Sequence, residues 1–338
     1  MSKSTFSLVL LLFALVLSAC SSNDATQEAE VATELIPVSI QLSWTHEYSS
    51  SPFYSAAQNG HFTEQGLDVT LIEGGFGEAG YIDPIEQVVS GNADFSLAAG
   101  SSLLLERASG QPVVAISSIL QRSPLAIISI EGSDIRRPAD LAGHTISAAS
   151  GGAQTTLISL LESQDLSEDD INFVERTSFG VDPLVNGEVD GLVAWIINEG
   201  VTLQEQGLVP EFIMMSDYGV DTYDFVLITS ETMINDRPDV VQRVINAMRE
   251  GLQDVVDNPA QAIEHTLIYN PELVADEQLR RLEATIPLMN VPGQPLGAMD
   301  ERVWQFTHDI LIEQNILAEP IALDDAYNLT FIPTEAED

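Results

Sequence analysis

Short apolar, β-rich segments alternate with helical segments along most of this 338-residue chain. Predicted strands cover 36–43, 67–72, 93–98 and 113–119. Predicted helices cover 53–59, 82–90 and 101–109. The first two helices stop at Gly60 and Gly91, as helices often do. Because helices that connect strands cover both faces of a sheet, this order predicts an α/β fold.

A second series of strands follows, and long helices then replace it. Predicted strands cover 125–130, 145–149, 171–174, 191–196, 211–215 and 223–229. Predicted helices cover 153–163, 238–256, 272–284 and 300–314. We therefore expect a discontinuous first lobe, residues 36–122 and 223–338, and a second lobe, residues 123–222. The chain would cross between them near 120–123 and 221–225, and a cleft between hinged lobes is a usual small-molecule site.

The N-terminal residues have the pattern of a secretory signal. Lys3, the only lysine, precedes an apolar run over 8–17 and the sequence LSAC, which ends at Cys20. The run is shorter than the roughly 20 apolar residues that cross a bilayer. We expect residues 1–19 to be a lipoprotein signal peptide, Cys20 to carry lipid on the extracytoplasmic side of the cell membrane, and the polar residues 20–35 to be a flexible tether. The alternative is an ordinary signal followed by a stray buried cysteine.

Acidic residues dominate the charge of the chain. It has 52 Asp+Glu against 12 Lys+Arg and a formal net charge of -40. Nucleic acid and anionic membrane surfaces require a basic footprint, so both are excluded as partners. The acids are spread along the whole sequence. This distribution fits a salt-adapted surface, whose self-repulsion salt screens, and equally an acidic protein without such adaptation.

The cysteine and histidine residues offer no metal site. Cys20 is the only cysteine, so a mature chain has no disulfide and no cysteine cluster. The five histidines are His46, His61, His144, His265 and His308. None lies at metal-ligand spacing from another. No Gly-x-Ser-x-Gly motif is present. We predict no metal, no cofactor and no catalytic residue.

The loop after the first predicted strand is rich in aromatic and polar side chains. Trp44, His46, Glu47 and Tyr48 follow this strand at its carboxyl end, where α/β sheets bind ligands. Flat heterocycles stack on aromatic rings, so we expect Trp44 and Tyr48 to contact the ligand. Phe53 is better interpreted as a core residue of the next helix.

Further candidates lie at the crossings and after strands of the second lobe. Glycines at 151–152 would let the backbone approach a ligand, and the N–H groups at the start of the next helix would donate to it. The alternative is a helix start capped by serine without a ligand. Asn198 and Glu199 would accept hydrogen bonds from the ligand. Arg122 and Asp224 would either contact the ligand or pair with each other. These candidates are Ser101, Gln121, Arg122, Ser150, Gly151, Gly152, Gln154, Thr155, Trp195, Asn198, Glu199, Tyr223 and Asp224.

Four motifs, in this order, are similar to those of the family of thiamine-precursor-binding and Thi5-like proteins. They are QLSWTHEYSSSPFYSAAQNGHFTEQGLDVTL at 41–71, SGNADF at 90–95, DLAG at 140–143 and GEVDG at 187–191. Each is short, but their order and spacing extend the resemblance over about 36–251. The resemblance implies a type II periplasmic-binding-protein fold with two hinge crossings. It also implies a monomer that delivers a small-molecule ligand to an ABC permease with its ATPase.

The resemblance extends to a subgroup that binds flavin or pyrimidine vitamins, so we expect riboflavin or a thiamine-type pyrimidine as the ligand. A sulfonate- or taurine-binding protein of the same fold is one alternative. The candidate acids Glu47, Glu199 and Asp224 outnumber the single cation Arg122, which disfavours an anion. A Thi5-like pyrimidine synthase is the second alternative. Such enzymes use a cysteine-rich motif, a particular histidine and a pyridoxal-phosphate lysine, and this chain has no lysine after Lys3.

Overall fold

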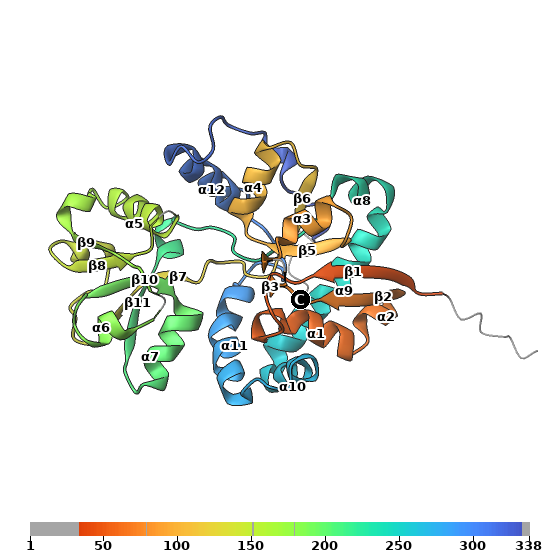
Figure 1. The fold of residues 1–338 in the computed structure, drawn as a ribbon, viewed down its shortest axis with the longest axis horizontal. Helices are drawn as coiled ribbons and strands as arrows, with labels where there is room; N and C mark the ends of the chain where they lie inside the picture. The colour runs from red at the N-terminus through yellow and green to blue at the C-terminus, as the bar shows by residue number, and fades with distance from the viewer. Residues whose placement is uncertain (1–33, 79, 151, 179, 333–338) are drawn as a thin grey trace, which may run out of the picture. The chain divides into compact units, whose positions relative to one another are not determined.

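The structure is a computed structural model that describes residues 34–332, with the exception of residues 79, 151 and 179. Two five-stranded sheets organise this part of the chain (Figure 1). In each sheet one strand, next to an edge, runs antiparallel to both of its neighbours. Helices pack on the sheets, so the α/β prediction is confirmed.

The first sheet has the strand order β2-β1-β5-β12-β6. Its strands are β1 (Ile36–Gln41), β2 (Leu67–Ile72), β5 (Phe95–Ala98), β6 (Val113–Ser118) and β12 (Val226–Ser230). β1 pairs parallel with β2 and β5. β12, which follows the second sheet in the sequence, pairs antiparallel with β5 and β6. The strands β3 (Phe76–Gly77) and β4 (Gly80–Tyr81) form a separate hairpin.

The second sheet has the order β11-β7-β10-β8-β9. Its strands are β7 (Leu125–Ile130), β8 (Thr145–Ala148), β9 (Asn172–Glu175), β10 (Gly191–Trp195) and β11 (Pro210–Met214). β8 pairs parallel with β9 and β10, and β7 pairs antiparallel with β10 and β11. Read from β9, the strand directions repeat those of the first sheet, with the antiparallel strand again in the fourth place, although that strand comes last along the chain in the first sheet and first in the second.

The chain passes twice between the two sheets (Figure 1). It leaves the first sheet after β6, returns before β12, and thereby gives the two-lobe arrangement that the sequence predicts. The lobe boundaries at 122/123 and 222/223 stay predictions.

Helices of very different length connect and cover the strands. The longer ones are α1 (Ser51–Gln58), α4 (Gly100–Ala108), α5 (Gly152–Glu162), α9 (Pro238–Asp257), α10 (Pro259–Tyr269), α11 (Ala275–Met289) and α12 (Glu301–Glu313). The shorter ones are α2 (His61–Glu64), α3 (Pro84–Val89), α6 (Asp182–Val185), α7 (Val201–Glu205) and α8 (Glu231–Asp236). A 3-10 turn, Tyr48–Ser50, precedes α1, and a π-helical turn, Ile196–Gly200, follows β10.

Most predicted elements are present within a few residues of their predicted limits, and two differ more. The predicted helix 272–284 is α11, which starts later, at Ala275, and continues through Pro287 to Met289. The predicted strand 223–229 starts three residues later, as β12. The sequence analysis missed α10, although Asn258 and Pro259 are typical of a helix start and the Asn258 side chain accepts from the Gln261 N–H at 3.3 Å.

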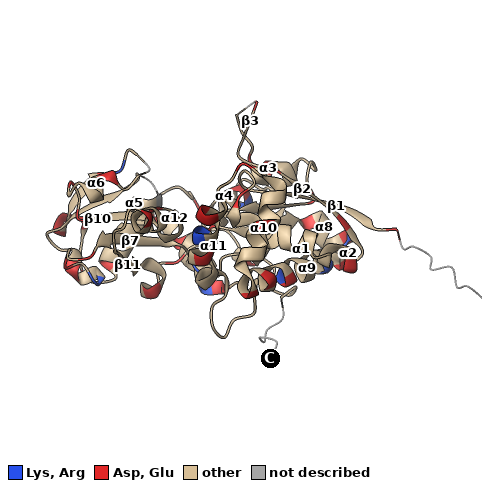
Figure 2. Cartoon of the chain, turned by 90° about the horizontal axis from the view of Figure 1, so that it is seen from below, with Lys and Arg blue, Asp and Glu red and all other residues tan. Residues whose placement is uncertain are grey.

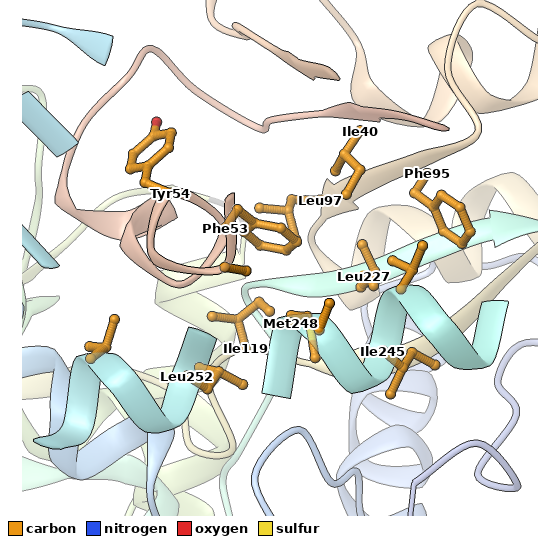
Figure 3. Packing of buried hydrophobic residues seen from close by; sticks show 14 of the residues in the cluster. Ile40, Phe53, Tyr54, Phe95, Leu97, Ile119, Leu227, Ile245, Met248 and Leu252 are labelled. Atoms are coloured by element: carbon orange, nitrogen blue, oxygen red, sulfur yellow. The ribbon is translucent and has the colours of Figure 1, made fainter. Parts of the chain in front are cut away.

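The main core lies between the first sheet and the helices α1 and α9 (Figure 3). Phe53 and Leu227 are among its fully buried side chains, as predicted for Phe53. Gly251 of α9 lets the two helices approach, because a Cβ there would lie 2.1 Å from the Pro52 carbonyl oxygen and 3.0 Å from the Ala56 Cβ. This core fixes the start of α1 and, with it, the loop that carries Trp44.

Acidic residues are distributed over the described parts of the chain, and basic residues are sparse (Figure 2). No helix of the described ranges combines the length and apolar character needed to cross a membrane. Cys20 and the predicted signal peptide and tether lie almost wholly outside the described residues.

Candidate ligand-binding cleft

A cleft of about 490 Å³ opens where β1, β5 and β10 end. This is the edge at which α/β sheets bind ligands, because the loops that follow parallel strands converge there. Its lining is part aromatic and part acidic. The residues that line it are Ser43, Trp44, Glu47, Tyr81, Asp83, Pro84, Ile85, Ala98, Ala99, Ser102, Trp195, Asn198, Asp224 and Phe225.

Hydrogen bonds between the ends of β1 and β2 hold the loop that carries Trp44. The Gln41 amide Nε2 donates to the carbonyl oxygens of Leu42 and Glu73, each at 3.0 Å. The Gly74 N–H donates to the Trp44 carbonyl oxygen at 2.9 Å. A Cβ at Gly74 would lie 2.2 Å from the Leu42 carbonyl oxygen, so only glycine permits this approach. The backbone that carries Trp44 is therefore fixed by the first sheet.

Aromatic rings flank the cleft from two sides. The Phe76 ring meets the Trp44 and Tyr81 rings in edge-on contacts, with centroids 5.7 Å and 5.6 Å away. Trp44 and Tyr81 are 42% and 53% exposed, so their faces remain accessible. On the other side, the Trp195 ring meets the Phe225 ring edge-on at 5.9 Å. Such rings can stack on a flat ligand.

Three carboxylates line the cleft, and among the described residues that line it none is Lys, Arg or His. Burial raises the pKa of Glu47, against a hydrogen bond from Ser49 and the charge of Arg281. Asp83 is the N-cap residue of α3, and its side chain accepts from the Ile85 N–H at 2.9 Å. A cleft of this composition can accept hydrogen bonds from a ligand and repels an anion.

The carboxyl group of Asp224 is tied to the opposite crossing. It accepts from the Ser123 hydroxyl at 2.8 Å, while Asp221 accepts from the Ser123 N–H at 2.9 Å. Burial, aided by the charge of Asp221 and opposed by the Ser123 hydrogen bond, raises the pKa of Asp224 to about 7. Burial likewise raises the pKa of Asp221 to about 6. Ser123 thus joins the two crossings through two aspartates.

Five of the predicted site residues lie in the cleft lining: Trp44, Glu47, Trp195, Asn198 and Asp224. Tyr48 lies behind it, buried, with its hydroxyl donating to Asn198 Oδ1 at 3.1 Å. Ser101 is next to the lining residue Ser102.

Other predicted residues have structural partners away from the cleft lining. His46 Nδ1 lies 2.9 Å from the Tyr54 hydroxyl, and burial lowers the His46 pKa, opposed by Glu73. Gln121 accepts from the Val291 N–H at 2.9 Å and donates to the Pro295 carbonyl oxygen at 2.7 Å. Tyr223 is buried against Trp304.

Arg122 and Glu199, which the sequence analysis proposed as ligand contacts, have ionic partners away from the cleft lining. Arg122 does not pair with Asp224; it donates to Asp217 at 2.5 Å and to the Ser216 hydroxyl. Glu199 is not among the lining residues, because it pairs with Arg176 at 2.7 Å and both side chains are largely buried, at 14% and 6% exposure. The acid next to Asn198 thus stabilises the second lobe.

The described residues of the segment that starts at Ser150 are not among those that line this cleft. The Ser150 hydroxyl donates to Glu175 at 2.5 Å, and Gln154 donates to Glu168 at 2.9 Å. Thr155 is likewise not a lining residue, Gly152 begins α5, and Gly151 lies outside the described residues.

The sequence analysis missed several lining residues, above all Tyr81 and Asp83. Tyr81 is the last residue of β4 and Asp83 directly precedes α3, in a segment for which the sequence analysis predicted only the helix 82–90. The sequence YIDP over 81–84 carries one signal, since Asp followed by Pro is a common helix start. The other missed lining residues are Ser43, Pro84, Ile85, Ala98, Ala99, Ser102 and Phe225.

Comparison with known proteins gives one family and several relatives. The family model described as NMT1/THI5 like matches residues 47–262. A formylaminopyrimidine-binding protein of Halalkalibacterium halodurans is 27% identical, over 94% of this chain and 96% of that protein. The riboflavin-binding protein RibY of Chloroflexus aurantiacus is 24% identical, over 96% of each chain.

Among solved structures, the chain resembles the periplasmic aliphatic sulphonate binding protein SsuA of Escherichia coli. The TM-score is 0.64, with 15% identity over 85% of this chain and 95% of that chain. At this identity the likeness concerns the fold, and it confirms the periplasmic-binding-protein architecture.

Proposed function

The chain belongs to the NMT1/THI5-like family, and from this premise we propose that it is an extracytoplasmic solute-binding protein that captures a flat, nitrogen-rich heterocycle for an ABC importer. The ligand is riboflavin or a thiamine-type pyrimidine. The names of the relatives agree with both, because one is a formylaminopyrimidine-binding protein and the other binds riboflavin. The protein acts by binding, and its partners are the permease and ATPase that receive the ligand.

The observation that carries the proposal is the composition of the cleft. In the part of the chain that the structure describes, Glu47, Asp83 and Asp224 are the ionisable residues that line it, apart from Tyr81. A sulfonate would meet three acceptors and no cation, which is costly in a partly buried site. A ring with amino or ring N–H groups would donate to these carboxylates.

The aromatic lining supplies the second part of recognition. Trp44 and Tyr81 flank the cleft on one side and Trp195 on the other. Their faces suit a planar ring, and each aromatic pair is worth about 0.5–1.5 kcal/mol beyond the area that it buries. A cleft of about 490 Å³ is of the size that small-molecule sites usually have.

Isothermal titration calorimetry of the purified protein tests the ligand class. We expect heat from riboflavin or 4-amino-5-hydroxymethyl-2-methylpyrimidine and none from taurine. The ligand that binds should also raise the free energy of unfolding, by about 2.7 kcal/mol at 100 times its Kd. Tight binding of taurine, with no heat from either heterocycle, would refute the proposal and favour a sulfonate-binding function.

The proposal includes a lipid anchor at Cys20, supported by the apolar run, the sequence LSAC and the polar segment after it. Cys20→Ser should move the protein from the membrane fraction to the soluble fraction, because acyl chains supply the attachment. Lys3→Arg, which keeps the charge before the apolar run, is the control and should leave the protein in the membrane. A Cys20→Ser protein that resists extraction in high salt would show another mode of attachment.

A further inference from the structure

We propose that Asn198 determines ligand specificity by donating its amide N–H₂ group to a hydrogen-bond acceptor of the ligand, and that Arg281 is the positioning residue that sets this orientation. The inference rests on the proposed function, since it assumes that a heterocycle occupies the cleft. It assigns to Asn198 the opposite role from that expected from the sequence, where Asn198 accepts from the ligand.

Three elements converge on the Asn198 side chain. Asn198 belongs to the π-helical turn after β10, Tyr48 to the 3-10 turn before α1, and Arg281 to α11. The Tyr48 hydroxyl and Arg281 Nη1 both donate to Asn198 Oδ1, at 3.1 Å and 3.2 Å. The turn after β10 is therefore held by two donors that belong to the first lobe.

The two donors are themselves fixed. Tyr48 is buried, and its backbone N–H donates to Gln278 Oε1 at 2.9 Å. The Arg281 side chain is 17% exposed, and its Nη2 lies 3.0 Å from Glu277 Oε1, one helical turn earlier. Burial restrains the Tyr48 ring, the Gln278 contact restrains its backbone, and the Arg281 guanidinium is held by Glu277.

Arginine chemistry decides which end of the Asn198 amide faces the cleft. The oxygen and nitrogen of an amide are alike in shape, and hydrogen bonds determine their assignment. A guanidinium has only donors, so the amide atom that meets Arg281 must be the oxygen. Within the described residues, Asn198 Nδ2 has no hydrogen-bond partner, and Asn198 lines the cleft. The N–H₂ group is therefore the end that is left for the ligand.

This donor complements the carboxylates of the cleft. Glu47 and Asp224 can accept from the ligand, and Asn198 can donate to it. The combination recognises a ring edge that carries a donor next to an acceptor. An aminopyrimidine has an amino group beside a ring nitrogen, and the flavin ring has an imide N–H between carbonyl oxygens. A ring edge with donors alone would leave the Asn198 group unpaired, which costs binding free energy.

Calorimetric titration of purified variants tests the inference, with riboflavin and 4-amino-5-hydroxymethyl-2-methylpyrimidine as probes. Asn198→Asp keeps an oxygen for Tyr48 and Arg281 but removes the donor, so we expect about tenfold weaker binding of the probe that binds the wild-type protein. Arg281→Met should weaken binding about as much, because the amide is then free to turn. In an Asn198→Ala background, the same Arg281→Met change should have little further effect.

The matched control is Arg280→Met, in the next residue of α11. Arg280 contacts Glu205 of the second lobe at 2.8 Å and does not contact Asn198, so we expect binding within about twofold of wild type. Thermal unfolding checks that each variant folds, and Asn198→Ala replaces Asn198→Asp if the latter does not.

Each other outcome overturns the inference. Wild-type affinity of the Asn198 variant would mean that Asn198 only connects the two lobes and does not contact the ligand. An equal loss with Arg280→Met would assign the effect to lobe contacts in general. Additive losses from Arg281→Met and Asn198→Ala would mean that Arg281 acts without Asn198. If the wild-type protein binds neither probe, the proposed function itself fails and this inference fails with it.

Discussion

The first and second sheets have the same pattern of strand directions, each with one antiparallel strand next to an edge, but they contribute very differently to the cleft. Loops and helices of the first sheet supply Trp44, Glu47, Tyr81 and most other lining residues, whereas the second sheet supplies Trp195 and Asn198 alone. A symmetric pair of sheets thus carries an asymmetric site. We expect the ligand to bind first to the first lobe and the second lobe to close over it.

The packing around glycine also differs between the first and the second lobe. The first sheet lies under the long helix α9, whose Gly251 meets the backbone of α1. In the second sheet, Gly191 of β10 is also tightly packed, but its neighbours are the side-chain ends of Ile146 and Ile127. Backbone atoms cannot rotate away from an added methyl group, whereas isoleucine side chains can adjust. This contrast predicts a rigid first lobe and a more adaptable second lobe.

The largest expected effect is on stability, and it comes from two glycine substitutions. Gly251→Ala would place a Cβ 2.1 Å from the Pro52 carbonyl oxygen, so we expect a loss of about 3 kcal/mol or more in the free energy of unfolding. Gly191→Ala would place its Cβ 3.0 Å from Ile146 Cδ1, and we expect a loss of about 1 kcal/mol. Urea denaturation of both variants measures the difference. Equal losses would contradict the contrast in packing.

A smaller effect is expected when one tryptophan is removed from each side of the cleft. Trp44→Ala should weaken binding of the heterocycle by about 1–3 kcal/mol, because Trp44 is fixed by the first sheet and flanked by Phe76. Trp195→Ala should cost less, about 0.5–1 kcal/mol, since Trp195 reaches the ligand only as the second lobe closes. Calorimetric titration compares the two. A larger loss for Trp195 would mean that the second lobe is the main binding surface.

Sequence pattern predicts the elements well where turns and apolar periodicity agree. The strands 67–72 and 125–130 have the predicted limits, because glycine, proline or charged residues bound each apolar run. Pro287 would usually end a helix, and tertiary packing of α11 overrides that preference. Strand order is a property of long-range pairing, so the shared pattern of strand directions in the two sheets becomes visible only in the structure.

The candidate site was predictable mainly where its residues follow a strand, and Asp224, at the return crossing before β12, is the exception. Trp44 and Glu47 come after β1, and Trp195 and Asn198 end or follow β10, so position along the chain sufficed. Tyr81 reaches the cleft because β3 and β4 form a hairpin, which no local pattern specified. Glu199 is adjacent to Asn198 in sequence, but its pairing with the distant Arg176 removes it from the lining.

The last expected effect concerns Asp224, at the junction of the two regions. Burial raises its pKa to about 7 in the folded protein, from an ordinary value of 3.8. Between these values the folded state binds more protons than the unfolded state, so the contribution of Asp224 to stability is most favourable at low pH and falls as the pH rises through about 7. Asp224→Asn removes this charge. It should raise the free energy of unfolding by about 1 kcal/mol at pH 7.5 relative to wild type, with little difference near pH 4. Urea denaturation across this pH range measures the effect.

Asp217→Asn, which removes an exposed carboxylate of the second lobe, is the control. If both variants change stability equally at every pH, Asp224 is not a buried charge at the junction, and the tie through Ser123 does not restrain the crossings.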